Sequence, residues 1–319
     1  MRVTVRAYAR LHLGFLNLNR DLGWNYGGIG VGVDAPRITL RATPGEGLAV
    51  TGGHEERILG YAQRLSSHFG RTWNARLEVL EAIPGHSGLG SGTQWALAVG
   101  AALLKLHGMD SPPRELAVIL GRGGRSGIGV SSFESGGFIL EAGHKPASPG
   151  EPVRPSQVVL RREFPANWRF VLVLADAPEG LSGAEEKKAF ASLGETRTIT
   201  ETICRIALLR LLPALIEEDI RAFGNAMSEI DMQTGLFFQQ AQGGAYREDA
   251  REMIAQLMGA GAYGVGQSSW GPCLYVLVDD ANEEAVARAA EKHLEDMGRT
   301  GRVFVTRARN EGAEILVEN

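Results

Sequence analysis

The chain has 319 residues, of which 44% are hydrophobic and 22% charged, a composition typical of a folded globular protein. Its formal net charge is −4 and it contains no basic run, so a nucleic acid is not an expected partner. The sequence has no stretch of about 18 apolar residues and its start alternates polar with apolar residues, so we expect no membrane span, no signal peptide and a cytoplasmic location.

In the first half of the chain, hydrophobic periodicity predicts alternating strands and helices. Strand periodicity covers residues 3–10, 27–33, 37–42 and 75–79, and a turn at Asp34, Ala35 and Pro36 is expected between the second and third strands. Helical spacing covers residues 55–69, 95–106 and 113–121, with Gly70 as the C-cap of the first helix and Ser111 as the N-cap of the third. Residues 121–137 are rich in glycine and are predicted to form a binding loop, followed by a strand over 138–142.

The proline-containing segment 144–155 separates the two halves of the chain and is predicted to be a linker. Beyond it we expect strands over 158–161, 170–174, 273–278 and 302–306, and helices over 197–212, 213–227, 247–258 and 283–295. This order predicts an α+β protein with domains over residues 1–150 and 151–319. Cys204 and Cys273 fall in apolar segments and are expected to be core thiols.

A glycine-rich segment, PGHSGLGSGTQ over residues 84–94, stands directly before a long amphipathic helix. Alternating glycines let the backbone turn tightly, and the first turn of a helix adds unpaired N–H donors and the positive end of a dipole. Together these features predict a phosphate or diphosphate site; the alternative is a simple capped turn. The residues that we expect to contact this group are Gly88, Leu89, Gly90, Ser91, Gly92 and Thr93.

This segment resembles the second motif of the GHMP kinase superfamily, in which the loop surrounds the phosphates of a nucleotide. Two other segments agree with the resemblance: SGIG over residues 126–129, and YGVGQSSWGP over residues 263–272. The resemblance implies a two-domain GHMP-kinase-like fold, with an N-terminal ribosomal-S5-like α/β domain and a C-terminal ferredoxin-like α+β domain.

One position separates this chain from many kinases of that superfamily. Gly129 stands where they carry the aspartate that takes the proton of the acceptor hydroxyl, and glycine has no side chain for that role. Some members work without this aspartate, so an ATP-dependent small-molecule kinase stays an alternative. A non-catalytic sensor of a phosphorylated metabolite is a second alternative, from another class.

Five segments together are similar to the β-ribofuranosylaminobenzene 5′-phosphate synthase family: RLHLGF over residues 10–15, YGGIGV over 26–31, and residues 88–94, 121–129 and 266–272. The family joins a para-substituted benzoate to phosphoribosyl diphosphate (PRPP) and releases CO2 and diphosphate, in methanopterin biosynthesis. The resemblance implies the same reaction here, with the ring substituent, amino or hydroxyl, left open. Forming this carbon–carbon bond removes no acceptor proton, which agrees with Gly129.

The resemblance and the residue chemistry together suggest roles for further side chains. A guanidinium suits a phosphate, so Arg122 and Arg125 are expected to bind the 5′-phosphate or the diphosphate, although a solvated loop face is the alternative. A cation is needed for the benzoate carboxylate, and the candidates are Arg10, His12 and His86. Gln267, Ser268, Ser269 and Trp270 are expected to line the site, Trp270 as a flat wall.

Magnesium is the expected cofactor, because Mg2+ prefers carboxylate and phosphate oxygens. The candidate ligands are Glu134 and Asp34, each of which is otherwise explained as an exposed or capping acid. No carboxylate cluster is visible in the sequence. A homodimer is possible, and nothing in the sequence specifies it.

Overall fold

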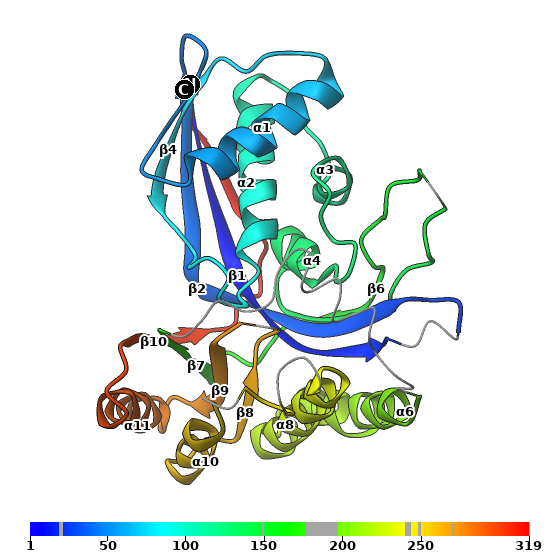
Figure 1. Ribbon diagram of the computed structural model, residues 1–319, viewed down its shortest axis with the longest axis vertical. Coiled ribbons are helices and arrows are strands. Elements are labelled where there is room, and N and C mark those ends of the chain that lie inside the picture. Colours follow the sequence, from blue (N-terminus) through cyan, green and yellow to red (C-terminus); the bar gives the residue numbers. More distant parts are fainter. Residues whose placement is uncertain are drawn as a thin grey trace.

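The computed structural model describes residues 1–18, 22–148, 150–176, 197–239, 244–247, 250–269 and 271–318. They form two β-sheets, one above the other in Figure 1, each covered by helices. The first sheet has seven strands in the order β11-β1-β2-β4-β3, with β5 paired to β2 and β6 paired to β5. Its strands are β1 (Arg2–Asn17), β2 (Tyr26–Pro44), β3 (Leu48–Thr51), β4 (Ala75–Glu81), β5 (Phe138–Glu141), β6 (Val158–Arg162) and β11 (Glu314–Glu318).

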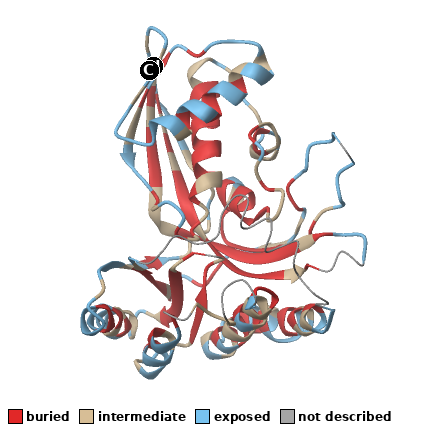
Figure 2. Ribbon diagram, in the orientation of Figure 1, coloured by how far each residue is buried: buried red, intermediate tan, exposed pale blue. Residues whose placement is uncertain are grey.

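Four helices cover one face of the first sheet (Figure 1): α1 (Glu55–Phe69), α2 (Ser91–Leu106), α3 (Pro113–Ile119) and α4 (Ile128–Ser135). Helix α2 is central and is buried from Gln94 to Leu104 (Figure 2). The predicted bounds of α1 and its Gly70 C-cap are confirmed. The predicted Ser111 cap is wrong, because α3 begins directly after Pro112, and α4 occupies part of the stretch that was predicted to be a loop.

The second sheet is antiparallel, with strand order β10-β7-β9-β8. Side chains alternate across it: Val171 and Val173 belong to the core beneath α10 and α11, whereas Phe170 and Leu172 belong to the main core on the other side. Its strands are β7 (Trp168–Ala175), β8 (Gly264–Gln267), β9 (Cys273–Asp279) and β10 (Gly301–Arg307). The helices of this half are α6 (Arg197–Ile206), the π-helix η1 (Ala207–Leu211), α7 (Leu212–Ile216), α8 (Ile220–Phe237), α10 (Arg251–Gly259) and α11 (Glu283–Asp296).

Two predicted elements differ from the structure. Residues 34–36, which were predicted to form a turn, lie within the continuous strand β2. β2 pairs with β1 both before and after these residues, and the register of the pairing shifts between Tyr8 and Arg10. The helix predicted over 213–227 is divided, since α7 ends at Ile216 and Asp219 caps a new helix by accepting a hydrogen bond from the backbone N of Ala222 (2.9 Å).

The two sheets do not divide the chain at residue 150. β6 pairs with β5, and β11 returns to pair with β1, so both complete the first sheet although they follow that residue. Both chain ends lie at the same end of the molecule in Figure 1. The long β1–β2 pair runs through the first half and also contacts α6 and α8 of the second half, so it is shared by both.

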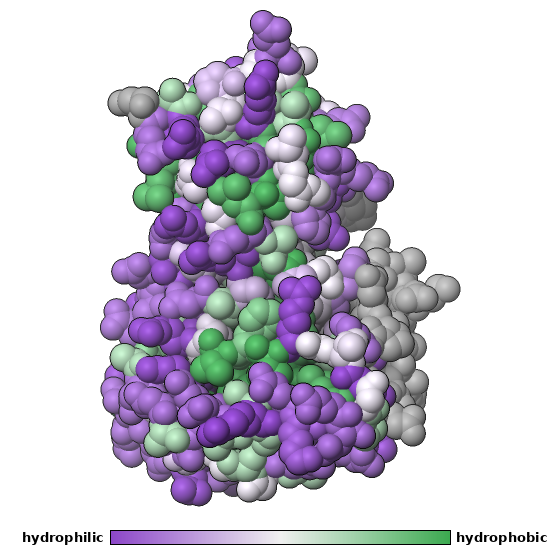
Figure 3. Space-filling view, turned by 90° about the vertical axis from the view of Figure 1, so that its left-hand side faces the viewer, coloured by the Kyte–Doolittle hydropathy of each residue, from purple (hydrophilic) through white to green (hydrophobic). Residues whose placement is uncertain are grey.

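The surface agrees with the composition. On the face shown in Figure 3, hydrophilic residues predominate and hydrophobic ones gather in smaller areas between them. Within the described part of the chain, no helix has both the length and the apolar character needed to cross a bilayer.

Candidate functional site

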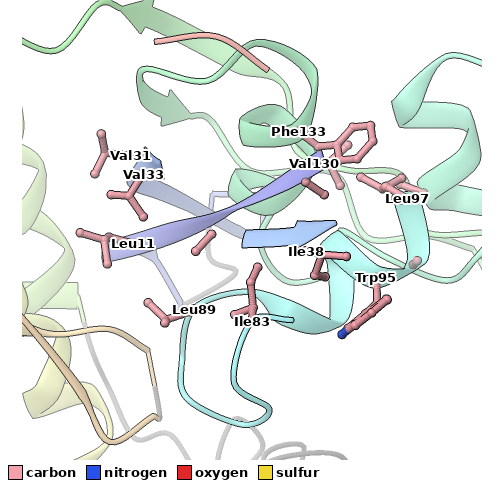
Figure 4. Close-up of a cluster of buried hydrophobic side chains, with 14 of the residues drawn as sticks. Leu11, Val31, Val33, Ile38, Ile83, Leu89, Trp95, Leu97, Val130 and Phe133 are labelled. Carbon is pink, nitrogen blue, oxygen red and sulfur yellow. The ribbon is translucent and has the colours of Figure 1, made fainter. Parts of the chain in front are cut away.

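The glycine-rich segment forms a turn that ends at the N-terminus of α2, and we call residues 84–92 the phosphate loop. Gly90 is the N-cap of α2 in the left-handed region, with φ 78°. Leu89 is fully buried, and its side chain lies with Leu11 and Ile83 in the cluster that continues to Trp95 of α2 (Figure 4). Leu89 therefore anchors the loop through its side chain, and its predicted role in ligand contact is limited to its backbone.

The late glycine-rich segment packs directly on the phosphate loop through Ser268 and Gly271, and we call its described residues 267–269 and 271–272 the serine loop. Ser268 is buried, and its hydroxyl donates to the Gly88 carbonyl (2.9 Å) while accepting from the backbone N of His12 (3.1 Å). A Cβ at Gly88 would lie 2.0 Å from the Ser268 carbonyl oxygen, and Gly88 has φ 85°. The backbones of the two loops are therefore too close for any side chain at Gly88.

Two arginines flank the phosphate loop. The guanidinium of Arg10 donates to the Gly88 carbonyl, and its side chain lies within 3.2 Å of where a Cβ at Gly90 would be. The guanidinium of Arg122 lies 2.9 Å from where a Cβ at Gly92 would be. It donates to the Tyr61 hydroxyl and lies over the Tyr61 ring. The start of α2 thus combines a helix N-terminus with two permanent positive charges, an arrangement suited to a phosphate.

His12 does not supply a third charge. The residue is buried, and burial, reinforced by the charge of Arg10, lowers the pKa of His12 to about 3. The imidazole is neutral near pH 7, so the expectation that His12 is a cation for the carboxylate is wrong. His12 instead lines a pocket between β1, α8 and the serine loop, together with Phe15, Asp231 and Thr234.

The other predicted site residues lie in different parts of the structure. Ser91 and Thr93 lie in the first turn of α2, and Gln267 and Ser269 line the pocket beside His12. His86 is exposed on the phosphate loop, and Arg125 is half-buried three residues beyond Arg122. Trp270 lies outside the described residues, and Trp95 is fully buried in the core.

The two predicted metal ligands are engaged with arginines. Glu134 accepts a hydrogen bond from Arg114 (2.9 Å), and Asp34 lies 3.4 Å from Arg309. These pairs speak against both acids as Mg2+ ligands, since each carboxylate is already neutralised. Across the residues that the structure describes, no group of three His, Cys, Asp or Glu side chains is placed to hold a metal ion.

Two buried carboxyl groups near the site were not predicted from the sequence. Asp231 accepts from the backbone N of Gln267 (2.9 Å) and from the Tyr275 hydroxyl (2.8 Å), so it fixes the serine loop to β9. Glu141 accepts from the backbone N of Gly127 (2.9 Å) and from the Ser131 hydroxyl (3.0 Å), at the start of α4. Burial raises the pKa of each carboxyl to about 7.

Replacing Glu141 with glutamine should change how stability depends on pH. The folded state keeps the carboxyl protonated up to about pH 7, whereas the unfolded state releases the proton near pH 4.5. The protonated Glu141 carboxyl therefore contributes its full share of the folding stability below pH 4.5. This contribution, on the order of 3 kcal/mol, is lost as the pH rises through 7. Denaturant unfolding at pH 5 and pH 8 measures it: the free energy of unfolding of Glu141→Gln, relative to the unaltered protein, should rise between these pH values. An unchanged difference would contradict the raised pKa.

The fold and the order of its elements define the class: a protein with the GHMP kinase fold. The family description "GHMP kinases N terminal domain" matches residues 56–137, and "GHMP kinases C terminal" matches residues 211–296. Homoserine kinase from Cytophaga hutchinsonii has a similar structure, with a TM-score of 0.69 at 17% identity, covering 99% of this chain and 97% of that one. Mevalonate diphosphate decarboxylase from Staphylococcus aureus gives the same TM-score at 15% identity, with 99% and 98% covered.

Similarity in sequence is more specific than similarity in fold. The chain is 34% identical to β-ribofuranosylphenol 5′-phosphate synthase of Methanothermobacter thermautotrophicus, with 99% of both chains covered. It is 33% identical to the enzyme of the same name from Archaeoglobus fulgidus, with 98% of this chain and 99% of that one covered. Homoserine kinase from Pyrobaculum islandicum is 25% identical over 75% of this chain. The chain belongs to the β-ribofuranosylphenol 5′-phosphate synthase family, which confirms the family predicted from the sequence; the names of these two relatives specify a phenol ring.

Proposed function

We propose that this protein is a decarboxylating phosphoribosyltransferase that makes β-ribofuranosylphenol 5′-phosphate from 4-hydroxybenzoate and PRPP. The full-length similarity to two synthases of that name is the observation that carries the proposal. The phenol in their name favours the hydroxyl ring over the amino ring. The step belongs to methanopterin biosynthesis, as the family resemblance implies.

The reaction balances without an acceptor base. The ring carbon that bears the carboxylate attacks C1 of the ribose as the bond from C1 to the diphosphate oxygen breaks. The bond from the ring to the carboxylate then breaks, CO2 leaves, and its electron pair restores the aromatic ring. The para-hydroxyl group supports the attack by releasing electrons into the ring.

The protein's part in this reaction is to bind and to stabilise charge. The backbone of Gly88–Thr93 and the N-terminus of α2 would hold the diphosphate, with Arg10 and Arg122 on either side of it. Negative charge grows on the diphosphate as the bond to C1 breaks, so these donors stabilise the transition state more than the bound substrate. At position 129, a Cβ would lie 3.3 Å from the Thr93 side chain, and glycine leaves this place beside the loop without an acid.

Mg2+ is a part of the proposal that the protein's own acids do not support. The described residues offer no carboxylate cluster at the phosphate loop, so Mg2+ would be held mainly by diphosphate oxygens, and we assign no step to it. A cytoplasmic location and assembly into a homodimer likewise stay predictions.

Comparing the products of PRPP and ATP separates the synthase from the kinase alternative. With PRPP and either 4-hydroxybenzoate or 4-aminobenzoate, mass spectrometry should detect the C-riboside phosphate of the phenol, and the hydroxyl ring should have the higher kcat/KM. With ATP and a panel of small alcohols, no ADP should form. ADP formation without a C-riboside product would return the chain to the kinases, and a preference for the amino ring would correct the substrate.

A further inference from the structure

Three successive carbonyl groups of the phosphate loop accept hydrogen bonds from outside the loop. The Gly88 carbonyl accepts from the Ser268 hydroxyl (2.9 Å) and from the guanidinium of Arg10. The carbonyl before it, of Ser87, accepts from the first backbone N of β9 (3.3 Å), and the carbonyl after it, of Leu89, accepts from the backbone N of Arg10 (3.2 Å). Groups of β1, β9 and the serine loop therefore determine which way these carbonyls point.

The N–H groups of this turn point away from the bound carbonyls. The loop has trans peptide bonds, and in a trans peptide the carbonyl and the N–H point in opposite directions. The N–H groups of Gly88, Leu89 and Gly90 donate no hydrogen bond to another described residue. Successive N–H groups of this kind form a nest for an anion, here directly before the N-terminus of α2.

The residues of the turn do not by themselves fix these peptide planes. Gly88 and Gly90 have φ of 85° and 78°, and glycine has more accessible backbone conformations than any other residue. The Leu89 side chain is buried in the core (Figure 4), which fixes its Cα and leaves the peptide before it free to rotate about Gly88. The orientation of the Gly88–Leu89 peptide therefore depends on the groups that bind its carbonyl.

The Ser268 side chain is fully committed to contacts within the protein. It is fully buried, and its hydroxyl donates to the Gly88 carbonyl while accepting from the backbone N of His12 (3.1 Å). A hydroxyl has a single hydrogen, so these two bonds fix its direction. This leaves no donor of the side chain for a substrate.

The backbone around Ser268 is also held in place. Its N donates to the Cys273 carbonyl (2.9 Å), and its carbonyl accepts from the backbone N of Gly271 (3.3 Å). The buried carboxyl of Asp231 accepts from the backbone N of Gln267, directly before it (2.9 Å). The hydroxyl is thus carried by a fixed part of the second sheet, whereas the carbonyl that it binds belongs to the first half of the chain.

We infer that Ser268 is a positioning residue for the diphosphate: its hydroxyl holds the Gly88 carbonyl away from the anion and so directs the Leu89 N–H toward it. The inference rests on the proposed function, in which this loop holds the diphosphate of PRPP, and adds a residue that acts without touching the substrate. Without the hydroxyl, the Gly88 carbonyl keeps only the Arg10 guanidinium, which the proposed function also assigns to the diphosphate. Rotation of the peptide would then turn a carbonyl oxygen, in place of an N–H, toward the anion.

Ser268→Ala tests the inference, because it removes the hydroxyl and adds no atom to a buried place. We expect the Kd of diphosphate, measured by calorimetry with Mg2+ present, to rise about tenfold. KM for PRPP should rise by a similar factor, whereas KM for 4-hydroxybenzoate should not change. General damage to the structure would alter the values for both substrates, so this difference separates positioning from damage.

Ser228→Ala is the matched control. The Ser228 hydroxyl accepts from the backbone N of Val265 (2.8 Å), and this bond joins α8 to β8 without involving the phosphate loop or β1. Both variants lose a serine hydroxyl that accepts from a backbone N–H, so both should lower the free energy of unfolding. Only Ser268→Ala should weaken the binding of diphosphate.

An unchanged diphosphate Kd in Ser268→Ala, or an equal rise in Ser228→Ala, would overturn the inference. An unaltered protein that binds no diphosphate would overturn it as well, whether or not CO2 is released from 4-hydroxybenzoate and PRPP. The expected rise in Kd, combined with no CO2 release by the unaltered protein, would remove the proposed function and keep the positioning role of Ser268.

Discussion

Gly88→Ala should lower kcat/KM for PRPP by about a hundredfold, the size of effect that follows from displacing a binding group by an ångström. The added Cβ would lie 2.0 Å from the Ser268 carbonyl oxygen, and φ at this position is 85°. The phosphate loop and the serine loop must then separate, which displaces both the diphosphate donors and the wall of the neighbouring pocket. Overpacking and the unfavourable φ together should also reduce the free energy of unfolding by on the order of 2–4 kcal/mol. Steady-state kinetics and denaturant unfolding measure the two effects.

Gly85→Ala is the matched control in the same loop. No atom lies within 4 Å of a Cβ at Gly85, and its φ is outside the left-handed region. The control should therefore keep both activity and stability. Equal kinetics for the two variants would show that the contact between the two loops is not needed for PRPP use.

Arg122→Ala should raise KM for PRPP by about tenfold to a hundredfold, because a charge-assisted hydrogen bond to a phosphate contributes roughly 1.5–3 kcal/mol. Its guanidinium lies beside Gly92 in the first turn of α2, where the helix dipole already favours an anion. Arg122→Lys keeps the charge but loses the planar fork, so its KM should fall between those of the alanine variant and the unaltered protein. Initial rates over a range of PRPP concentrations give these values.

Arg71→Ala controls for the loss of a stacked arginine. Arg71 lies over the Trp73 ring at 5.0 Å, much as Arg122 lies over Tyr61 at 5.5 Å, but it contacts Met109 beyond the opposite end of α2. KM for PRPP should be unchanged in this variant. If Arg122→Ala leaves KM unchanged as well, Arg122 stacks on Tyr61 for structural reasons and does not bind substrate.

The phosphate loop was predictable because its signal is local. Alternating glycines followed by a helical pattern specify both a turn and a helix N-terminus, and the structure shows both within residues 84–106, although α2 is buried on all sides and is not amphipathic. Helix α1 and its Gly70 cap were predictable for the same reason. The position of Arg122 beside Gly92 could not be predicted, because it depends on how α3 packs against α2.

Helix α4 was missed because its residues have weak helix propensity. Gly129 and its neighbouring serines favour a loop when they are considered alone. Tertiary contacts hold the helix: Glu141 accepts from the backbone N at its start, and Gln94 of α2 donates to the Gly129 carbonyl (2.8 Å). Neither partner is close enough in sequence to be visible in a local pattern.

The pocket beside His12 was also beyond sequence reasoning. Thr234 lies in α8 and Phe238 at its C-terminal end, more than 200 positions after His12. In the sequence, their spacing indicates only an ordinary amphipathic helix. The charge of His12 was misjudged because its burial is a property of the folded protein. The GQSSWGP string drew attention to the serine loop, but its packing on the phosphate loop and β1 is seen only in the Ser268 hydrogen bonds.

The release of labelled CO2 from carboxyl-labelled 4-hydroxybenzoate tests the central claim most directly. The purified protein would be given Mg2+, the labelled acid and PRPP, with PRPP omitted in a parallel reaction. We predict CO2 release that requires PRPP and equals the diphosphate formed, one for one. Diphosphate release without CO2, or no release of either from active protein, would contradict the assignment as a decarboxylating phosphoribosyltransferase.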